Sequence, residues 1–543
     1  MRTLRLALVS LLAIIFLATT ASADDASLGR VGENVQPIFN TRVEMLAEDV
    51  RVKVTPERSF VEAVFIFRNN GPAATVLVGF PEEEILDGRE GFGDDTELHD
   101  FKAFIDGKEV PVQKKKGLVP EINPRSIDYP SWYTWEVEFA EGQIRELRNT
   151  YWVKNLYWSN GEVLAGYILT TGSTWEGSIG HARVTFEMQD ILPYRLRAII
   201  PGNYRFEGHN LVWEWWDFDP DTNIEVIFDN RGLLPFVQQA LPPEAADQWW
   251  QKITAGKYLE VLQEIGDLKG KGSNPELEQA LAIYEAWANQ GLGRHEESTA
   301  AWERILEMAV NPGEIYLLSA LAQEEAFYHL AEDYHRAGEQ EKLEKLYLQL
   351  RALRLNAHLH RWVETLLPPE KLRTEPPLIN KLEFLAGPSE SNVYYLSVDI
   401  EDPDGDIVSF YYNLWYEEGG EKKEITFERP HFWYNPYHIS TSYMVQGVPA
   451  DKNVYYYVEV MDTAGNIASA TGNLQEGRHK KDAKEEMTSG SEEALPGPFP
   501  DMHPWKLSAV FSWLAGTLSA AVLALLLLRH IIAIKRKRKQ QIL

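Results

Sequence analysis

The sequence contains no cysteine in its 543 residues. This absence excludes disulfide bonds, zinc sites built on thiolates, cysteine nucleophiles and thiol redox chemistry. The folded chain must therefore be stabilised by ordinary hydrophobic cores, which large domains can form without cross-links. Because 543 residues are too many for one core, we expect several domains.

Positive charge is also scarce. The chain has 53 lysine and arginine residues against 81 aspartate and glutamate residues, which gives a formal net charge of −28. A surface of this sign repels nucleic acid and anionic lipid, so we expect no nucleic-acid partner. It suits solubility and the loose binding of cations or of basic partners.

Catalytic signatures are missing as well. The sequence has neither the HExxH motif of zinc proteases nor the GxSxG motif of serine hydrolases. His358 and His360 are two residues apart on a predicted helix, so they point to different faces and cannot chelate one ion together. We therefore assign no catalytic and no cofactor-binding residue. The sequence favours a protein that is not an enzyme and leaves the question open.

Long apolar runs are confined to the two ends of the chain. Residues 1–23 combine a basic start, an apolar stretch and the pattern Ala21-Ser22-Ala23, which predicts a cleaved secretory signal. Residues 507–528 contain no charged residue and would reach about 33 Å as a helix, enough to cross a bilayer. By the positive-inside rule the basic tail 529–543 would stay in the cytoplasm. The sequence thus predicts a single-pass integral protein of the cell membrane, with its N-terminus outside.

The segment 31–235 is expected to form a β-sandwich region, either one unit or two lobes dividing near residues 120–130. Apolar and polar residues alternate strictly over 50–54, and Asn69-Asn70-Gly71-Pro72 is a turn signal that follows an apolar strand. Short strands separated by glycine, proline and aspartate turns are typical of sandwiches.

Three short motifs in this segment carry a resemblance. They are Glu48-Asp49-Val50-Arg51-Val52, Val64-Phe65-Ile66-Phe67-Arg68-Asn69 and Val78-Gly79-Phe80-Pro81. The segment resembles bacterial exported domains of unknown function that carry an FxFxN…vgFP pattern, loosely shared with the vault/inter-α-trypsin-inhibitor type of β-sandwich. The resemblance implies a sandwich fold and no particular activity.

The segment 243–370 changes to the periodicity of helices, with apolar residues three and four positions apart. The stretch that contains Gly338, Leu343 and Tyr347 resembles a tetratricopeptide helix pair, and an earlier stretch around Gly293 resembles it more weakly. The two glycines lie 45 residues apart rather than the roughly 34 of that repeat. The sequence therefore predicts an irregular helical array, with a plain helical bundle as the alternative.

The segment 376–475 contains two prominent turns, Asp402-Pro403-Asp404-Gly405-Asp406 and Asp462-Thr463-Ala464-Gly465-Asn466. It resembles the immunoglobulin/fibronectin-like repeats of bacterial surface proteins, in which DPDGD and DxAGN mark strand connections. Residues 476–504 lack apolar periodicity and are predicted to form a flexible stalk. The expected fold class is multidomain: an N-terminal β-sandwich region, a central all-α helical-repeat-like region, a C-terminal immunoglobulin-like β-sandwich and one transmembrane helix.

Clustered aspartates are the candidates for a metal site, because Ca²⁺ prefers several oxygen ligands. The first of the two turns begins like a calcium loop, but its glycine is fourth rather than sixth and Asn413 stands at the twelfth position. Aspartate also favours turns without any metal, so both interpretations stay open. The candidate ligands of a structural calcium, the sole cofactor considered, are Asp402, Asp404, Asp406, Asp217, Asp219 and Asp221.

Tryptophan is abundant, with 17 residues, and exposed indole rings could stack on sugars. The alternative is that the rings fill the sandwich cores. The candidates for glycan stacking are Trp132, Trp135, Trp152, Trp158 and Trp175.

We expect a membrane-anchored extracytoplasmic protein of bacterial type that binds or scaffolds protein or peptide partners. The alternatives are a surface protein that binds carbohydrate or cell wall, and a carboxylate-dependent hydrolase with convergent acids in a cleft.

Overall fold

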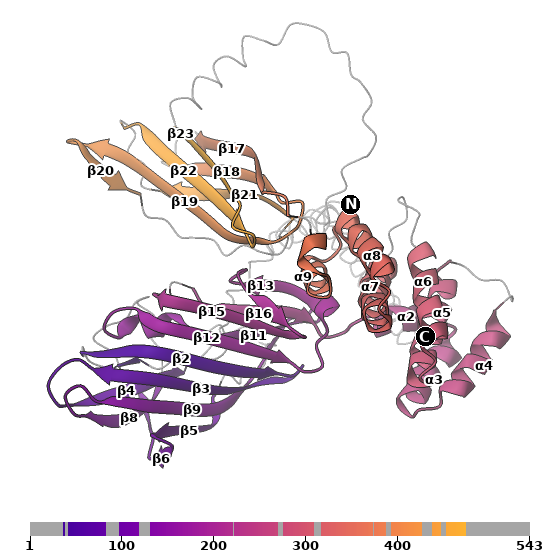
Figure 1. Cartoon of the computed structure of the whole chain (residues 1–543), viewed down its shortest axis with the longest axis horizontal. Helices are drawn as coiled ribbons and strands as arrows, with labels where there is room; N and C mark the ends of the chain where they lie inside the picture. The colour runs from indigo at the N-terminus through magenta and orange to yellow at the C-terminus, as the bar shows by residue number, and fades with distance from the viewer. Residues whose placement is uncertain are drawn as a thin grey trace, which may run out of the picture. The chain divides into compact units, whose positions relative to one another are not determined.

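The computed structural model describes residues 36–37, 42–82, 97–118, 131–220, 222–269, 275–308, 317–372, 374–386, 393–425, 437–446 and 452–473. Strands occupy the described chain up to Asp229, helices follow from Leu234 to Glu364, and strands return from Leu378 to Asn473. We refer to these as the β-rich region, the helical region and the C-terminal β module. Together they give the order β, α, β along the chain (Figure 1).

The predicted membrane helix requires a correction. Within the described ranges, no helix is both long and apolar enough to cross a membrane. The longest of them, α7 (Leu317–Ala337), has 21 residues but carries several acidic side chains, among them Glu324 and Glu325. The structure therefore does not support an integral single-pass protein or its placement in the cell membrane. The span predicted over 507–528 lies outside the described residues, as do the predicted signal, stalk and basic tail.

The β-rich region is built on one large sheet. Its eight strands follow the order β14-β15-β12-β2-β3-β9-β5-β6, so strands from both sides of residues 120–130 share it (Figure 1). The strand bounds are β2 Val43–Val54, β3 Arg58–Asn69, β5 His99–Ile105, β6 Lys108–Val110, β9 Ile144–Lys154, β12 Ile179–Met188, β14 Arg205–Glu207 and β15 Asn210–Phe218. The pairings that join the two halves in this sheet include the antiparallel pairing of β9 with β3 and the parallel pairing of β12 with β2, in which His181 lies opposite Ala47.

Two smaller sheets pack against the large one. Their orders are β1-β4-β8-β7 and β10-β11-β16-β13. The bounds are β1 Gln36–Pro37, β4 Ala74–Glu82, β7 Gln113–Lys116, β8 Ser131–Phe139, β10 Leu156–Tyr157, β11 Glu162–Tyr167, β13 Leu196–Ile200 and β16 Ile224–Asp229. Phe80 of β4 lies 5.2 Å, ring to ring, from Tyr151 of β9, and the Tyr167 hydroxyl of β11 donates to Glu48 of β2. Each small sheet thus covers a different part of the large sheet.

The burial of alternate residues explains why these segments form half-buried strands. In β3, buried and more exposed positions alternate, and Phe65 and Phe67 on the inner face are fully buried. The Phe67 ring packs 4.3 Å from the ring of Trp175. Because side chains in a strand point alternately to its two faces, the period of two in the sequence selects the face that enters the core.

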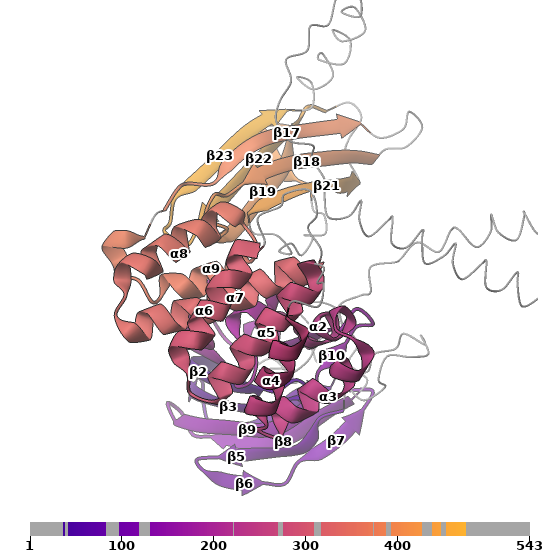
Figure 2. The same ribbon diagram turned by 90° about the vertical axis from the view of Figure 1, so that its right-hand side faces the viewer.

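The helical region consists of helices that pack on their neighbours in the chain. Contacts join α4 to α5, α5 to α6, α6 to α7 and α7 to α8, and Figure 2 shows these helices side by side. On α8, the residues predicted from helical spacing to face the core, Leu343, Leu346, Tyr347 and Leu350, are all buried. The bounds are α2 Leu234–Ala240, α3 Pro243–Thr254, α4 Tyr258–Leu268, α5 Pro275–Gly291, α6 His295–Met308, α8 Gln340–Leu353 and α9 Ala357–Glu364.

The C-terminal β module consists of two sheets. One has the order β17-β18-β21 and the other β20-β19-β22-β23. The bounds are β17 Leu378–Ala386, β18 Val393–Glu401, β19 Ile407–Glu418, β20 Glu421–Glu424, β21 His438–Gln446, β22 Val454–Asp462 and β23 Ile467–Asn473. Residues such as Leu396 of β18, Leu414 of β19 and Val458 of β22 form one buried cluster between them. The module has its own core and meets the preceding regions mainly at the turns described next.

Candidate functional site

The short helix α9 contacts both β parts of the chain. Its N-cap is Asn356, whose side chain accepts a hydrogen bond from the backbone N–H of Leu359 at 3.0 Å. Asparagine is favoured there because its side chain satisfies an N–H that has no partner within the helix. The Asn356 amide also donates to the carbonyl of Tyr194 in the β-rich region at 3.0 Å. One side chain therefore starts the helix and attaches it to its neighbour.

The two histidines of α9 have different partners, as their spacing predicts. The Nδ1 atom of His358 lies 2.7 Å from the hydroxyl of Tyr204 in the β-rich region. The Nδ1 atom of His360 lies 3.0 Å from the backbone carbonyl of Asp404 in the C-terminal β module. Burial lowers the pKa of His358 to about 3 and that of His360 to about 4, so both rings are neutral at pH 7.

Arg361 of α9 strengthens the contact with the β-rich region. Its guanidinium donates to the backbone carbonyls of Gly202 at 2.9 Å and Tyr204 at 2.5 Å. It also lies 3.9 Å from the centre of the Tyr204 ring, a cation–π distance. Gly202 in turn lies close to the C-terminal β module. A Cβ atom added to it would stand 2.8 Å from the carbonyl oxygen of Ile407.

The variant Gly202→Ala is therefore expected to lower the free energy of unfolding by about 1–3 kcal/mol, because backbone must move to admit the methyl group. Urea unfolding of the full chain measures this change. Gly266→Ala is the matched control. Gly266 lies within α4 with no atom within 4 Å of an added Cβ, so alanine should stabilise that helix by up to about 1 kcal/mol. Equal effects of the two substitutions would contradict the close approach at Gly202.

The turn between β18 and β19 is organised by Asp402. Its Oδ1 atom accepts hydrogen bonds from the backbone N–H groups of Asp404 at 2.8 Å and Gly405 at 2.7 Å. This is the usual way in which aspartate stabilises a turn. Gly405 has a φ of 69°, a conformation that glycine adopts without strain. The DPDGD pattern is thus explained in part by local structure alone.

The second turn, after β22, lies beside the first. Because β19 and β22 are paired, Ile407 stands opposite Asp462, and Asp406 therefore comes next to Thr463. The Thr463 hydroxyl donates to Oδ2 of Asp406, and the Thr463 backbone N–H donates to the Asp406 carbonyl at 3.1 Å. Asp462 accepts from both the backbone and the side chain of Asn466 at 2.7 Å.

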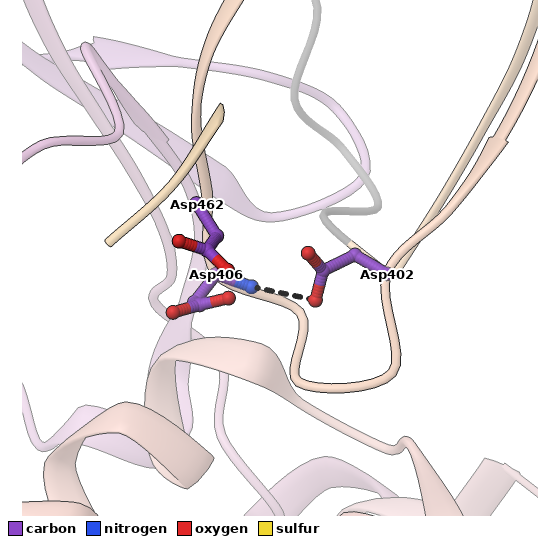
Figure 3. Close-up of side chains that lie close together, drawn as sticks. All are labelled: Asp402, Asp406 and Asp462. Carbon is purple, nitrogen blue, oxygen red and sulfur yellow. Dashed lines mark hydrogen bonds between the residues drawn. The ribbon is translucent and has the colours of Figure 1, made fainter. Parts of the chain in front are cut away.

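Three aspartates from the two turns form a compact buried cluster, which we call the aspartate cluster: Asp402, Asp406 and Asp462. One carboxylate oxygen from each lies within 4.8 Å of the others. The three side chains are 0%, 5% and 1% exposed. Figure 3 shows the Asp402 carboxylate pointing toward the other two. Oδ2 of Asp402 and Oδ1 of Asp406 are buried and have no hydrogen-bond partner among the described residues.

The surroundings of the cluster disfavour charged carboxylates. Burial, and after it the negative charge of Asp406, raise the pKa of Asp402 to about 7. Glu364 at the end of α9 also has its pKa raised to about 7, by burial and then by Asp406. Burial raises the pKa of Asp404 to about 6. The main cause in all three groups is the removal of water around the carboxylate, which disfavours its charged form.

Asp404, by contrast, has a cationic partner. Its Oδ1 atom lies 2.5 Å from the guanidinium of Arg351 on α8, and both side chains are nearly buried. Its Oδ2 atom accepts from the backbone N–H of Glu375 at 2.6 Å. Of the four aspartates in the two turns, Asp404 therefore joins the C-terminal β module to α8. The other three face one another in the aspartate cluster.

A cleft of about 550 Å³ adjoins the aspartate cluster. Its walls come from the β-rich region, from α9 with the segment after it, and from the C-terminal β module. It has charged residues of both signs and several apolar ones. The lining residues are Asn203, Tyr204, Arg205, Phe206, Arg361, Glu364, Thr365, Leu372, Val408, Met461, Asp462, Thr463 and Gly465. This volume lies within the usual range of about 300–1,000 Å³ for ligand sites.

The other predicted calcium candidates do not join this cluster. Asp217 and Asp219 are exposed near the end of β15, and Asp221 lies outside the described residues. Asp217 has a φ of 50°, which aspartate tolerates better than most residues. Sequence reasoning missed Asp462 as a candidate ligand. The signal for it was the second turn motif, but only strand pairing shows that the two turns meet.

The tryptophans proposed for glycan stacking are divided by the structure. Trp132, Trp135 and Trp175 are at most 4% exposed, so they belong to cores. Trp152 is half-buried, and its ring stacks on His99 at 3.8 Å and donates from Nε1 to Asp100. Trp158 is half-buried beside a small apolar cluster. Trp216, which sequence reasoning did not select, is 67% exposed.

Comparison with known proteins adds only distant structural similarity. No protein-family model matches the sequence, and no curated protein is significantly similar to it. A Legionella pneumophila protein described as a "putative nutrient binding protein" is 17% identical, with a TM-score of 0.36, over 56% of this chain and 98% of its own. The M1 zinc metallopeptidase of Deinococcus radiodurans is 11% identical, with a TM-score of 0.19, over 61% of this chain and 95% of its own.

Proposed function

We propose that this protein is a non-catalytic binding or scaffolding protein that holds a protein or peptide segment in the cleft beside α9. The observation that carries the proposal is the composition of the cleft, whose walls come from three parts of the chain. Arg205 offers a positive charge and the half-buried Glu364 an acidic group, while Leu372 and Val408 offer apolar atoms. An extended peptide presents this mixture of charged, polar and apolar groups.

The charges in the cleft suit a partner that is itself mixed in charge. Arg205 is exposed and shares its guanidinium with Glu207 and Glu214, and Arg361 is fixed by backbone carbonyls. Glu364, half-buried at the end of α9, provides a carboxyl group. Groups that are already held in place lose little freedom when a ligand binds, which favours affinity.

The test is selection of binders from a random-peptide display library on the full chain. The wild type should enrich a sequence consensus, and Asn203→Trp should lose at least tenfold in affinity for the selected peptides, because the indole would fill part of the cleft. Asn203 is exposed, so the substitution should spare the fold. Lys53→Trp is the matched control, an exposed strand position that does not line the cleft. Equal affinities of wild type and Asn203→Trp would contradict the proposal.

A carboxylate-dependent hydrolase is the second candidate. It is favoured by one observation: Glu364, with its pKa raised to about 7, and Asp462 line the same cleft. A carboxyl group with such a pKa can act as a general acid near neutral pH. Cleavage of a selected peptide by the wild type, in place of its retention, would identify this function.

A further inference from the structure

We infer that Asp402, Asp406 and Asp462 bind a divalent cation of the Ca²⁺ type, which joins the two turns of the C-terminal β module. The inference rests on the cluster. Asp462 also lines the peptide cleft, but metal binding and peptide binding are measured in separate experiments. Three carboxylate oxygens within 4.8 Å of one another match the spacing of ligands around one such ion.

The unpartnered oxygens are the second observation. Asp402 is fully buried and points toward the other two aspartates (Figure 3). Its Oδ1 atom is occupied by the backbone of its own turn, but its Oδ2 atom has no hydrogen-bond donor among the described residues. The same holds for Oδ1 of Asp406. Buried carboxylate oxygens are costly without a donor or a metal, and a cation among the three carboxylates would offset that cost.

The neighbouring arginines form no ion pair with the cluster, although burial raises the pKa of Asp406 and the charge of Arg361, acting from a distance, lowers it in part. Arg351 pairs with Asp404, and Arg361 directs its hydrogen bonds to the carbonyls of Gly202 and Tyr204. Within the part of the chain that the structure describes, no ion pair joins a lysine or arginine to any of the three aspartates. A divalent cation would supply the missing positive charge at the point where the three side chains meet.

The chemistry of the ligands selects the ion. All three are carboxylates, with no thiolate and no imidazole among them, which favours a hard cation such as Ca²⁺ or Mg²⁺ over zinc or copper. Ca²⁺ accepts six to eight oxygens in irregular geometry, whereas Mg²⁺ demands a near-ideal octahedron. Asp462 and Thr463 line the adjoining cleft, which gives a path for the ion and for the waters that would complete its coordination.

The test is calorimetric titration of the EDTA-treated, dialysed full chain with CaCl₂. We expect one saturable site with a Kd between about 10⁻⁵ and 10⁻³ M, and a melting temperature that rises with Ca²⁺. Asp406→Asn should weaken binding at least tenfold. Asp217→Asn is the matched control, because it removes one exposed carboxylate from the same acidic chain and should leave binding at this site unchanged. Titration with MgCl₂ and ZnCl₂ should give weaker binding.

The opposite set of results would overturn the inference. If the cluster binds no metal, wild type shows no saturable site up to about 10⁻² M Ca²⁺, roughly tenfold above the Kd of the weakest protein calcium sites. Asp406→Asn would then melt above the wild type, since it relieves repulsion between carboxylates. Saturable binding that Asp406→Asn leaves intact would likewise exclude these ligands. Should Asp406→Asn fail to fold, Asp462→Asn replaces it as the test of the ligands.

Discussion

Replacement of Arg351 by methionine is expected to lower the free energy of unfolding by about 3–5 kcal/mol, because it leaves the buried Asp404 carboxylate without its cation. The two groups lie 2.5 Å apart, and their side chains are 11% and 3% exposed. Methionine keeps most of the apolar length of arginine, so the loss reflects charge more than packing. Urea unfolding of the full chain, monitored by circular dichroism, measures the difference.

Two further variants test whether the loss comes from the buried Arg351–Asp404 ion pair itself. Lys371→Met removes an ion pair of similar distance, that of Lys371 with Glu344 at 2.7 Å. Both of its side chains are at least 34% exposed. Its cost should stay within about 1 kcal/mol, as is usual for exposed pairs. The double variant Arg351→Met with Asp404→Asn should cost less than the sum of the single variants. Additive losses would show that the two side chains stabilise the protein separately.

The free energy of unfolding is expected to fall by about 2 kcal/mol between pH 7 and pH 5 because of His358. Burial lowers the pKa of this ring to about 3 in the folded protein, against about 6.5 when unfolded. Between these two pKa values the unfolded chain binds the proton and the folded chain does not. The contribution is therefore complete above pH 6.5 and is lost progressively as the pH falls toward 3.

The comparison with His358→Gln isolates this contribution. Glutamine can still hydrogen-bond to the Tyr204 hydroxyl but does not titrate. The raised pKa values of Glu364 and Asp402 act in the opposite sense, since those carboxyls bind protons more readily in the folded protein as the pH falls. These carboxyls contribute equally to wild type and variant, so the difference between the two unfolding free energies reports His358 alone. Parallel stability profiles from pH 7 to pH 5 would show that His358 is not buried in the neutral form.

Much of the local structure follows from the sequence. The alternation around Val50 predicts a strand, and β2 runs from Val43 to Val54. The spacing of Leu343, Leu346 and Tyr347 predicts a buried helical face, and those residues are buried on α8. Such patterns are reliable because the period of side chains along a strand or helix is set by the backbone alone.

The arrangement of the strands could not be predicted in the same way. Nothing near Ala47 indicates that it pairs in parallel with His181, 134 residues later, because the partner of a strand is set by packing over the whole sheet. Nor does sequence separate a tryptophan such as Trp132, buried in a core, from Trp216, which is 67% exposed. Both stand in strands rich in aromatic residues, and the layer that covers a strand decides which of its faces is inside.

The candidate site shows the same division. The sequence alone determined that the chain has no thiol chemistry, that its order is β, α, β, and that DPDGD and DTAGN form turns held by aspartate. Those properties depend on residue type and on neighbours a few positions away. Only the tertiary structure brought Asp462 beside Asp406, placed α9 against both β parts and buried the Arg351–Asp404 pair. These contacts join residues far apart in the chain, and their energies depend on how completely water is removed around them.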